Sequence, residues 1–199
     1  MKRPTWVHAL ILGGFCLVYA LLLAVTNMFT AEPIRQRAIE DTENSLNQVV
    51  PASLYENKLV ADPIFVKGET GEEVKIYRGT KAGKVTGVAY EIRGSGYAGA
   101  IRLIMGVDPN GHILGVRAVS FKETPGLGDK IDAKKSDWIT RFTGKFLGDP
   151  PKDKWKVKKD GGVFDQFSGA TITPRAVVNA IRKGLEFFES HKAQILEVR

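Results

Sequence analysis

The N-terminal part of the chain contains a long stretch without a single charged residue. It covers residues 9–31, reads ALILGGFCLVYALLLAVTNMFTA and is 23 residues long. At a rise of about 1.5 Å per residue, a helix of this length crosses roughly 30 Å of hydrocarbon. The stretch therefore predicts a single transmembrane helix. In a chain of 199 residues it leaves room for one further domain of ordinary size.

A cleaved signal peptide is the main alternative for the same stretch. Signal peptides have a shorter apolar core, of about 7 to 15 residues, and small residues around the cleavage site. The residues Ala24, Val25 and Thr26 fit a cleavage site poorly, and Phe15 directly before Cys16 argues against a lipoprotein signal. We therefore expect a retained anchor, in which Cys16, the single cysteine, is an apolar residue of the span.

Charge does not decide which way the span is inserted, because two basic residues precede it and two follow it closely. The net charge of +7 would suit anionic lipid headgroups or acidic partner surfaces, but it is also a common means of keeping a protein soluble. No known nucleic-acid-binding motif accompanies the charge, so we expect no nucleic acid partner.

Three segments follow from the pattern along the chain. Residues 1–31 form the tail and anchor, residues 32–53 a helical connector, and residues 54–199 a globular domain. The connector has apolar residues at roughly helical spacing, among them Ile34, Ala38 and Leu46, and we expect Pro51 to end it.

The globular domain begins with alternating apolar residues, which are typical of strands. Such runs cover residues 74–77, 85–92, 101–107 and 113–119. Asn110 and Gly111 separate the last two, and this pair supplies the positive φ angles of a tight turn, so the two runs predict an antiparallel hairpin. Short helical pieces are expected at 127–131 and 136–142. The fold class is therefore α+β, with an antiparallel sheet and packed helices.

A final amphipathic helix is expected to begin at Thr173 as the N-cap and Pro174 as the first helical residue. Its apolar stripe, which would pack on the sheet, consists of Val177, Ile181, Leu185 and Phe188.

Lysines at every second position from Lys152 to Lys158 predict the polar face of an edge strand rather than a binding patch. The three histidines, His8, His112 and His191, are isolated from one another and from the cysteine, so we predict no metal site. We also predict no catalytic acid or base, because no paired carboxylates or Cys/His cluster is present.

The segment just before the final helix is the strongest candidate for a functional site. It contains Ser168, Gly169, Ala170 and Thr171, a hydroxyl-bearing residue that follows two very small ones. Backbone N–H groups at a helix N-terminus, together with the helix dipole, would stabilise a phosphate carried on Thr171. A plain capped loop is the alternative interpretation.

Two motifs in this chain resemble those of a known family. Asp165 followed by the Ser-Gly-Ala-Thr segment resembles the flavinylation motif of FMN-binding domains. The residues Glu123, Thr124, Pro125, Gly126, Leu127 and Gly128 match the ETPGLG segment of the Rnf-type G subunits and of the related C subunits of sodium-pumping NADH:quinone oxidoreductases. The similarity extends over residues 94–188 and includes Tyr97 in a Gly-Tyr-Ala-Gly segment; one departure is Phe121-Lys122, where family members often have a histidine.

The resemblance implies a membrane-anchored electron carrier with covalently bound FMN. A Mg-dependent flavin transferase would esterify FMN to Thr171, and the carrier would work with the other subunits of an Rnf complex between reduced ferredoxin and NAD. The cofactor-binding residues would be Thr171, Ser168, Gly169, Ala170, Asp165, Glu123, Thr124, Gly126, Leu127 and Tyr97. The family further implies a bacterial inner membrane, a cytoplasmic tail and a periplasmic domain.

The residues themselves give some of these positions a physical role. Pro125, Gly126 and Gly128 make a tight turn that a flat ligand can approach, with Thr124 as a hydroxyl and Leu127 as an apolar contact. Glu123 is expected either to accept a hydrogen bond from the ring or to be a solvated turn residue. Two other functions stay open from sequence: a non-redox adaptor of a membrane complex, and a domain that binds anionic surfaces.

Overall fold

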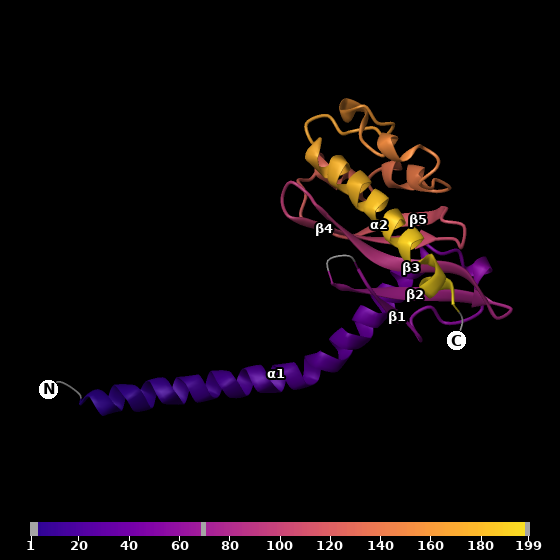
Figure 1. Cartoon of the computed structure of the whole chain (residues 1–199). Helices are drawn as coiled ribbons and strands as arrows, with labels where there is room; N and C mark the ends of the chain where they lie inside the picture. Colours follow the sequence, from indigo (N-terminus) through magenta and orange to yellow (C-terminus); the bar gives the residue numbers. More distant parts are fainter. Residues whose placement is uncertain (1–3, 69–70, 198–199) are drawn as a thin grey trace. The chain divides into compact units, whose positions relative to one another are not determined.

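The computed structural model describes residues 4–68 and 71–197 (Figure 1). The chain divides into two compact units, residues 1–42 and residues 43–199. The first is the greater part of helix α1 (Thr5–Asn47), and the second holds an antiparallel sheet, short 3-10 turns and helix α2 (Ile172–Leu196). This is the α+β architecture that the sequence predicts.

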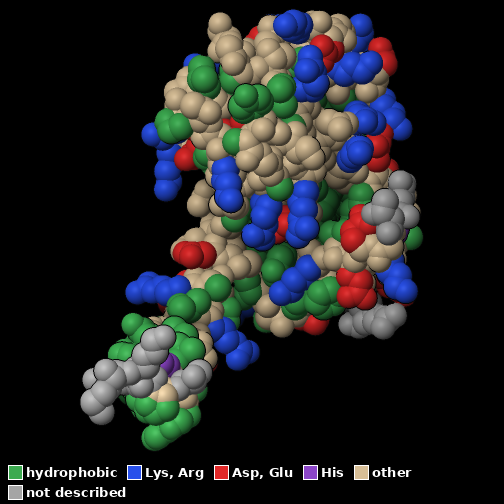
Figure 2. Space-filling model, turned by 90° about the vertical axis from the view of Figure 1, so that its left-hand side faces the viewer, with side chains coloured by type: hydrophobic (Ala, Val, Ile, Leu, Met, Phe, Trp, Pro, Cys, Tyr) green, Lys and Arg blue, Asp and Glu red, His purple; other side chains and the backbone are tan. Residues whose placement is uncertain are grey.

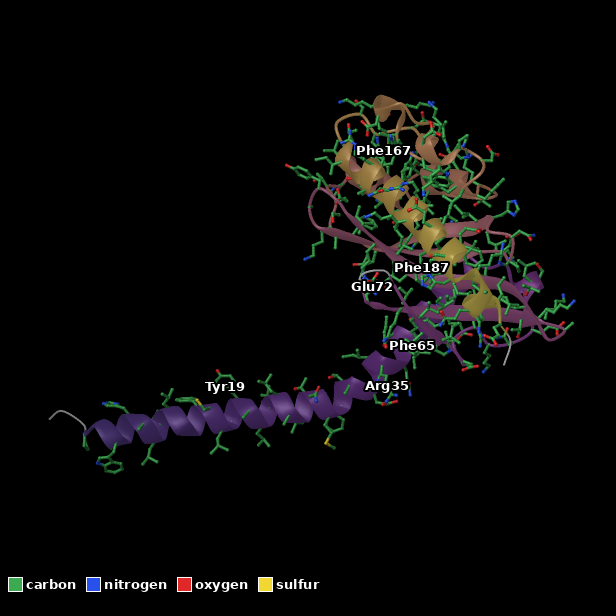
Figure 3. The ribbon with its side chains drawn as sticks, in the orientation of Figure 1. Tyr19, Arg35, Phe65, Glu72, Phe167 and Phe187 are labelled. Atoms are coloured by element: carbon green, nitrogen blue, oxygen red, sulfur yellow. The ribbon has the colours of Figure 1, made fainter. Side chains whose placement is uncertain are left out.

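Helix α1 has the length and apolar composition of a membrane span, as predicted. Its large apolar side chains are exposed: Leu17 is 73% exposed, and Tyr19 projects from the helix (Figure 3). Hydrophobic side chains surround its N-terminal end on the face shown in Figure 2. The hydroxyls of Thr26 and Thr30 each donate to the carbonyl four residues earlier, at 2.8 Å. Such internal bonding satisfies polar groups where lipid offers no partner.

The predicted connector helix is part of α1, which continues through Pro33 and ends at Asn47, four residues before Pro51. Beyond that end, the N–H groups of Val49 and Val50 both donate to the carbonyl of Leu46. All three side chains are buried in a small apolar cluster of the second unit. Packing within that unit therefore sets where the helix ends.

The five strands of the sheet follow one another in space in the order of the sequence. They are β1 (Ile64–Lys67), β2 (Glu73–Lys81), β3 (Lys84–Ser95), β4 (Ala100–Val107) and β5 (Ile113–Ser120), and each pairs antiparallel with the next. The four predicted strands are confirmed. Strand β1 escapes prediction because it has four residues, too few for a clear alternation.

The predicted hairpin between β4 and β5 is confirmed, with Gly111 at φ 93°. The Asp108 carboxylate accepts from the backbone N–H groups of Asn110 and His112, both at 2.8 Å, which fixes the turn. The His112 ring packs edge-on against Phe146, with the ring centroids 4.8 Å apart.

The main core lies between the sheet and α2, which crosses one sheet face (Figure 1). The predicted stripe of α2 is confirmed, because all four of its side chains are buried. Close approach is possible because Gly94 on β3 faces the helix: a Cβ there would lie 2.9 Å from the carbonyl oxygen of Ala176. The phenol of Tyr90 also donates to the carbonyl of Gly184 at 2.8 Å.

The predicted edge strand from Lys152 to Lys158 is wrong. The segment instead forms two short 3-10 turns, Lys152–Lys154 and Lys158–Asp160. Its alternation has another origin: Trp155 and Val157 are buried in an aromatic cluster with Phe142 and Phe164, while the lysines on either side of each remain exposed. Local turn hydrogen bonds replace the strand pairing that the pattern suggests.

Candidate functional site

Thr171 lies at the end of a tight turn that leads directly into α2. The backbone N–H of Ala170 donates to the carbonyl of Phe167 at 3.2 Å, and Gly169 at φ 77° takes the left-handed conformation that such a turn needs. Ser168 and Gly169 are exposed, and Thr171 is half-buried. The turn is therefore open to solvent at Ser168 and Gly169.

The start of α2 differs from the prediction. The helix begins at Ile172 with Thr171, not Thr173, in the N-cap position, and the Thr171 side chain makes no capping hydrogen bond. Its carbonyl accepts from the N–H of Arg175 at 3.3 Å, the first bond of the helix. The Thr171 hydroxyl thus makes no hydrogen bond with the part of the chain that the structure describes, although it stands beside the free N–H groups of a helix start.

Thr173 is buried, and its hydroxyl donates to Oε2 of Glu123 at 2.5 Å. This contact explains why Thr173 is not the cap: its side chain turns inward, to a carboxylate fifty residues earlier in the sequence. The other oxygen of Glu123 accepts from the backbone N–H of Ala98 at 3.3 Å. Glu123 therefore joins the 96–99 loop, the 123–128 turn and the start of α2.

Glu123 is only 7% exposed, so the alternative of a solvated turn residue is wrong, whereas a contact with the flavin ring stays a prediction. Two glycines make room for its carboxylate. A Cβ at Gly96 would overlap Oε1 of Glu123, and a Cβ at Gly128 would lie 2.7 Å from Oε2 and 2.8 Å from the hydroxyl of Thr173. The sequence indicated these glycines as turn residues, whereas the structure shows that they also leave space for a buried carboxylate.

The turn at 124–127 lies next to the Thr171 turn. The N–H of Leu127 donates to the carbonyl of Thr124 at 3.1 Å, with Gly126 at φ 79°. Leu127 is 40% exposed, and a Cβ at Gly169 would lie 3.4 Å from its Cδ2 atom. The structure thus brings together the two sequence motifs, with an apolar side chain beside Gly169 of the Thr171 turn.

Asp165 holds the other side of the Thr171 turn through exposed ion pairs. Its carboxylate lies 2.6 Å from Nζ of Lys158 and 3.0 Å from Nη1 of Arg141. The hydrogen bond from Lys158 and the charges of Lys158 and Arg141 lower the pKa of Asp165, against a smaller opposing effect of desolvation. Its backbone carbonyl accepts from Nε1 of Trp138 at 2.8 Å.

Phe167 is buried beneath the turn, with its ring centroid 5.0 Å from that of Trp138 (Figure 3). The aromatic contact and the Asp165 pairs fix the segment that leads to Thr171. Tyr97, by contrast, is 74% exposed, and no interaction of its side chain is found in the described part of the chain. Tyr97 is therefore a predicted site residue whose side chain does not pack against the other predicted site residues.

Sequence reasoning missed Asp129, which follows the ETPGLG segment. It is 9% exposed, and its Oδ1 atom is buried without a hydrogen-bond partner among the described residues. Buried carboxylate oxygens are normally satisfied, so this atom is an acceptor available to a further donor. Its position directly after a glycine turn gave no signal of burial. No group of three or more metal-ligating side chains occurs within residues 4–68 and 71–197.

The chain is similar to known proteins over its whole length. Residues 96–186 match the FMN-binding domain family, and residues 1–49 match the RnfG N-terminal region. The chain is 51% identical to the G subunit of the ion-translocating oxidoreductase complex of Cereibacter sphaeroides, over 98% of this chain and 89% of that protein. It belongs to the family of G subunits of ion-translocating oxidoreductase complexes.

Other members agree with this assignment. The G subunit of Vibrio vulnificus is 44% identical, over 95% of this chain and 92% of the Vibrio protein. The G subunit of Shewanella baltica is 40% identical, over 100% of this chain and 96% of the Shewanella protein. Family membership and the FMN-binding domain together make the protein a flavoprotein electron carrier of an ion-translocating oxidoreductase, with one candidate transmembrane helix among its described residues.

Two solved structures share the fold of this chain. The crystal structure of Shewanella oneidensis NqrC is 25% identical and covers 73% of each chain, with a TM-score of 0.50. The C subunit of the Na(+)-translocating NADH-quinone reductase from Parabacteroides distasonis is 21% identical and covers 79% of this chain and 96% of its own, with a TM-score of 0.57. The second likeness is evidence for the fold alone.

Proposed function

We propose that Thr171 carries FMN through a phosphoester bond to its hydroxyl. The observation that supports this most directly is the state of Thr171: the residue is only half-buried, its side chain makes no capping hydrogen bond, and it stands at the N-terminus of a helix of 25 residues. The positive end of the helix dipole and the unpaired N–H groups favour a phosphate at this position.

The attachment chemistry consumes FAD. The Thr171 oxygen forms a new bond to the phosphorus of the FMN half, the pyrophosphate P–O bond to the other half breaks, AMP leaves, and the hydroxyl proton passes to a base of the Mg-dependent flavin transferase. The exposed Ser168 and Gly169 offer no bulky side chain that would obstruct the transferase. The protein is the substrate of this step, not its catalyst.

The neighbouring residues fit a flavin. Leu127 gives a partly exposed apolar surface beside Gly169, and Thr124 and Gly126 form an open turn next to it. The unpartnered Oδ1 of Asp129 is an acceptor that an N–H or O–H group of a ligand could satisfy. Bound FMN supplies reversible electron uptake; the residues around it supply its placement and the polarity of its surroundings.

We further propose that the carrier passes electrons between redox subunits of an Rnf-type complex on the route from ferredoxin to NAD. The FMN domain would lie on the periplasmic side of a bacterial inner membrane. A covalent bond would retain the cofactor there, where no pool of FMN could replace a lost one. The anchor would hold it near the other carriers and raise its effective concentration.

The test of attachment compares hydroxyls in one turn. Thr171→Ala, Ser168→Ala and the unchanged protein are each produced with a flavin transferase, and covalent flavin is measured by fluorescence after denaturing electrophoresis and by intact mass. We expect Thr171→Ala to lose the flavin completely, and Ser168→Ala to keep it and to gain the mass of FMN less one water. Flavin on Thr171→Ala would refute the proposal.

Sidedness is tested separately, by protease treatment of intact spheroplasts followed by detection of fragments from residues 43–199. Digestion of the domain is expected. Protection of the domain in intact spheroplasts, with digestion after lysis, would place it in the cytoplasm and contradict the periplasmic assignment.

A further inference from the structure

A groove runs along the first three turns of α2, on the side of the helix that faces the end of β3 and the 152–160 segment. Its volume is about 1130 Å³. Its lining comes from the end of β3, the 152–160 segment and the start of α2, and it includes the basic residues Arg93, Lys152, Lys156, Arg175, Arg182 and Lys183. None of the predicted cofactor-binding residues is in this lining, although Ile172 directly follows Thr171. The groove, called the basic groove below, is therefore a second feature beside the attachment turn.

The basic groove carries excess positive charge. Six of its lining residues are lysine or arginine and two are aspartate. Glu91 and Glu186, which lie outside the lining, pair with Arg93 at 2.7 Å and with Lys152 and Arg182 at 2.9 and 2.7 Å. Even when both glutamates are included, the formal charge of the region is about +2, which attracts an anionic partner.

Two of the lysines take part in no ion pair among the described residues. Arg175 is paired with Asp160 at 2.6 Å, and the more distant charge of Lys156 also acts on that carboxylate. Neither Lys156 nor Lys183 forms an ion pair of its own with any residue that the structure describes. They come from different elements, the 152–160 segment and α2, and both side chains are exposed. These two cations are therefore available to bind carboxylates of a partner.

The shape favours an extended polypeptide over a nucleotide. From Ile172 to Lys183 the helix rises about 16 Å, a length that about five residues of extended chain span. The one aromatic residue of the lining, Trp155, is 1% exposed and donates to the carbonyl of Pro150, so it presents no face on which a base could stack. A row of carboxylates matches the spaced cations better than a single phosphate group does.

We propose that the basic groove is a docking site for an acidic segment of a neighbouring subunit of the oxidoreductase complex. Charge complementarity guides such a segment into the groove and fixes its register. Because the groove begins at the residue after Thr171, the docked partner is brought next to the turn that carries the cofactor under the proposed function. The docking itself needs no flavin on Thr171.

The experiment uses the assembled complex with a photo-crosslinking amino acid at Asn179, an exposed residue of the lining. Crosslinked peptides are identified by mass spectrometry. We expect a crosslink to an Asp- and Glu-rich segment of another subunit. Crosslinks only to lipid, to this chain itself or to a segment without acidic residues would overturn the proposal.

Charge reversal supplies the matched comparison. Lys156→Glu with Lys183→Glu is compared with Lys134→Glu and Lys135→Glu, two lysines outside the lining that change the net charge equally. The groove variant is expected to lower the Asn179 crosslink yield about tenfold, the effect of two lost charge contacts, while the control variant leaves it unchanged. Equal losses in both variants would show an effect of net charge alone and would refute a specific site.

Covalent flavin is measured in the same samples. Both variants are expected to retain it. Loss of flavin from the groove variant alone would mean that the basic groove serves the transferase, which overturns the docking proposal. Absence of flavin from every sample, including the unchanged protein, would contradict the assignment of Thr171 and leave the crosslink result to stand by itself.

Discussion

The turn that presents Thr171 is held on two sides by carboxylates in opposite environments. Glu123 is buried, and both of its oxygens accept hydrogen bonds within the domain. Asp165 is about half exposed and pairs with two cations at the surface. The comparison indicates that the buried glutamate fixes the position of the turn, because losing a buried partner is costly, whereas exposed ion pairs contribute little net stability.

The largest effect is expected from Glu123→Ala. The substitution leaves the buried hydroxyl of Thr173 and the N–H of Ala98 without their acceptor, so we expect the free energy of unfolding to fall by about 2–4 kcal/mol. Denaturant unfolding of the full chain in detergent measures it, with Lys122→Ala at the neighbouring position as control. A loss no larger than that of the control would show that the carboxylate is not a structural brace.

A smaller loss is expected from Gly128→Ala, because its Cβ would crowd both Glu123 and Thr173. Crowding of this kind costs about 1–3 kcal/mol. Gly126→Ala is the matched control: it has open space around it, and its positive φ alone should cost about 1–2 kcal/mol. If the Gly126 variant were less stable than the Gly128 variant, the conformation of the turn would contribute more to stability than the space left for the Glu123 carboxylate.

Asp165→Asn is expected to change the free energy of unfolding by less than about 1 kcal/mol, because both of its ion pairs are exposed and screened. The difference from the unchanged protein should shrink as salt is added. If Asp165→Asn lowered the free energy of unfolding as much as Glu123→Ala, or by an amount independent of salt, Asp165 and Glu123 would not differ in how strongly they stabilise the turn.

The smallest effect is the pH dependence of the same contact. Since Lys158 and Arg141 lower the pKa of Asp165 in the folded state, its contribution is present above the unfolded value of about 3.9 and is lost as pH falls through the folded value. Unfolding curves of the Asp165→Asn variant and the unchanged protein should therefore converge below about pH 4. A constant difference down to about pH 3 would contradict the assigned ion pairs.

Local pattern was enough to predict most of the sheet, the α2 stripe and the glycine turn at 110–111, because alternation and helical spacing report directly on which face is buried. Prediction from local pattern failed where contacts with residues distant in the sequence determine the local structure. Thr173 has the sequence context of a helix cap, but its hydroxyl is bonded to Glu123, fifty residues earlier in the sequence. The lysine run has the alternation of a strand, because Trp155 and Val157 alternate with lysines while packing into an aromatic cluster.

The candidate site could be predicted from the sequence mainly because two motifs resemble those of a known family. The resemblance implies all ten candidate residues, but it does not show how they are arranged in space. The structure adds that Leu127 lies against the Gly169 turn, that Glu123 is a brace, and that Tyr97 stays apart. Asp129 could not be predicted, since an aspartate after a glycine turn is ordinarily at the surface.

The hydroxyl of Thr171 contributes no capping hydrogen bond to the folded chain. Under the proposed attachment to Thr171, the domain consequently reaches its final shape before any cofactor arrives, and loading the flavin breaks no capping bond. Cells short of flavin would then accumulate folded, colourless protein instead of misfolded chains.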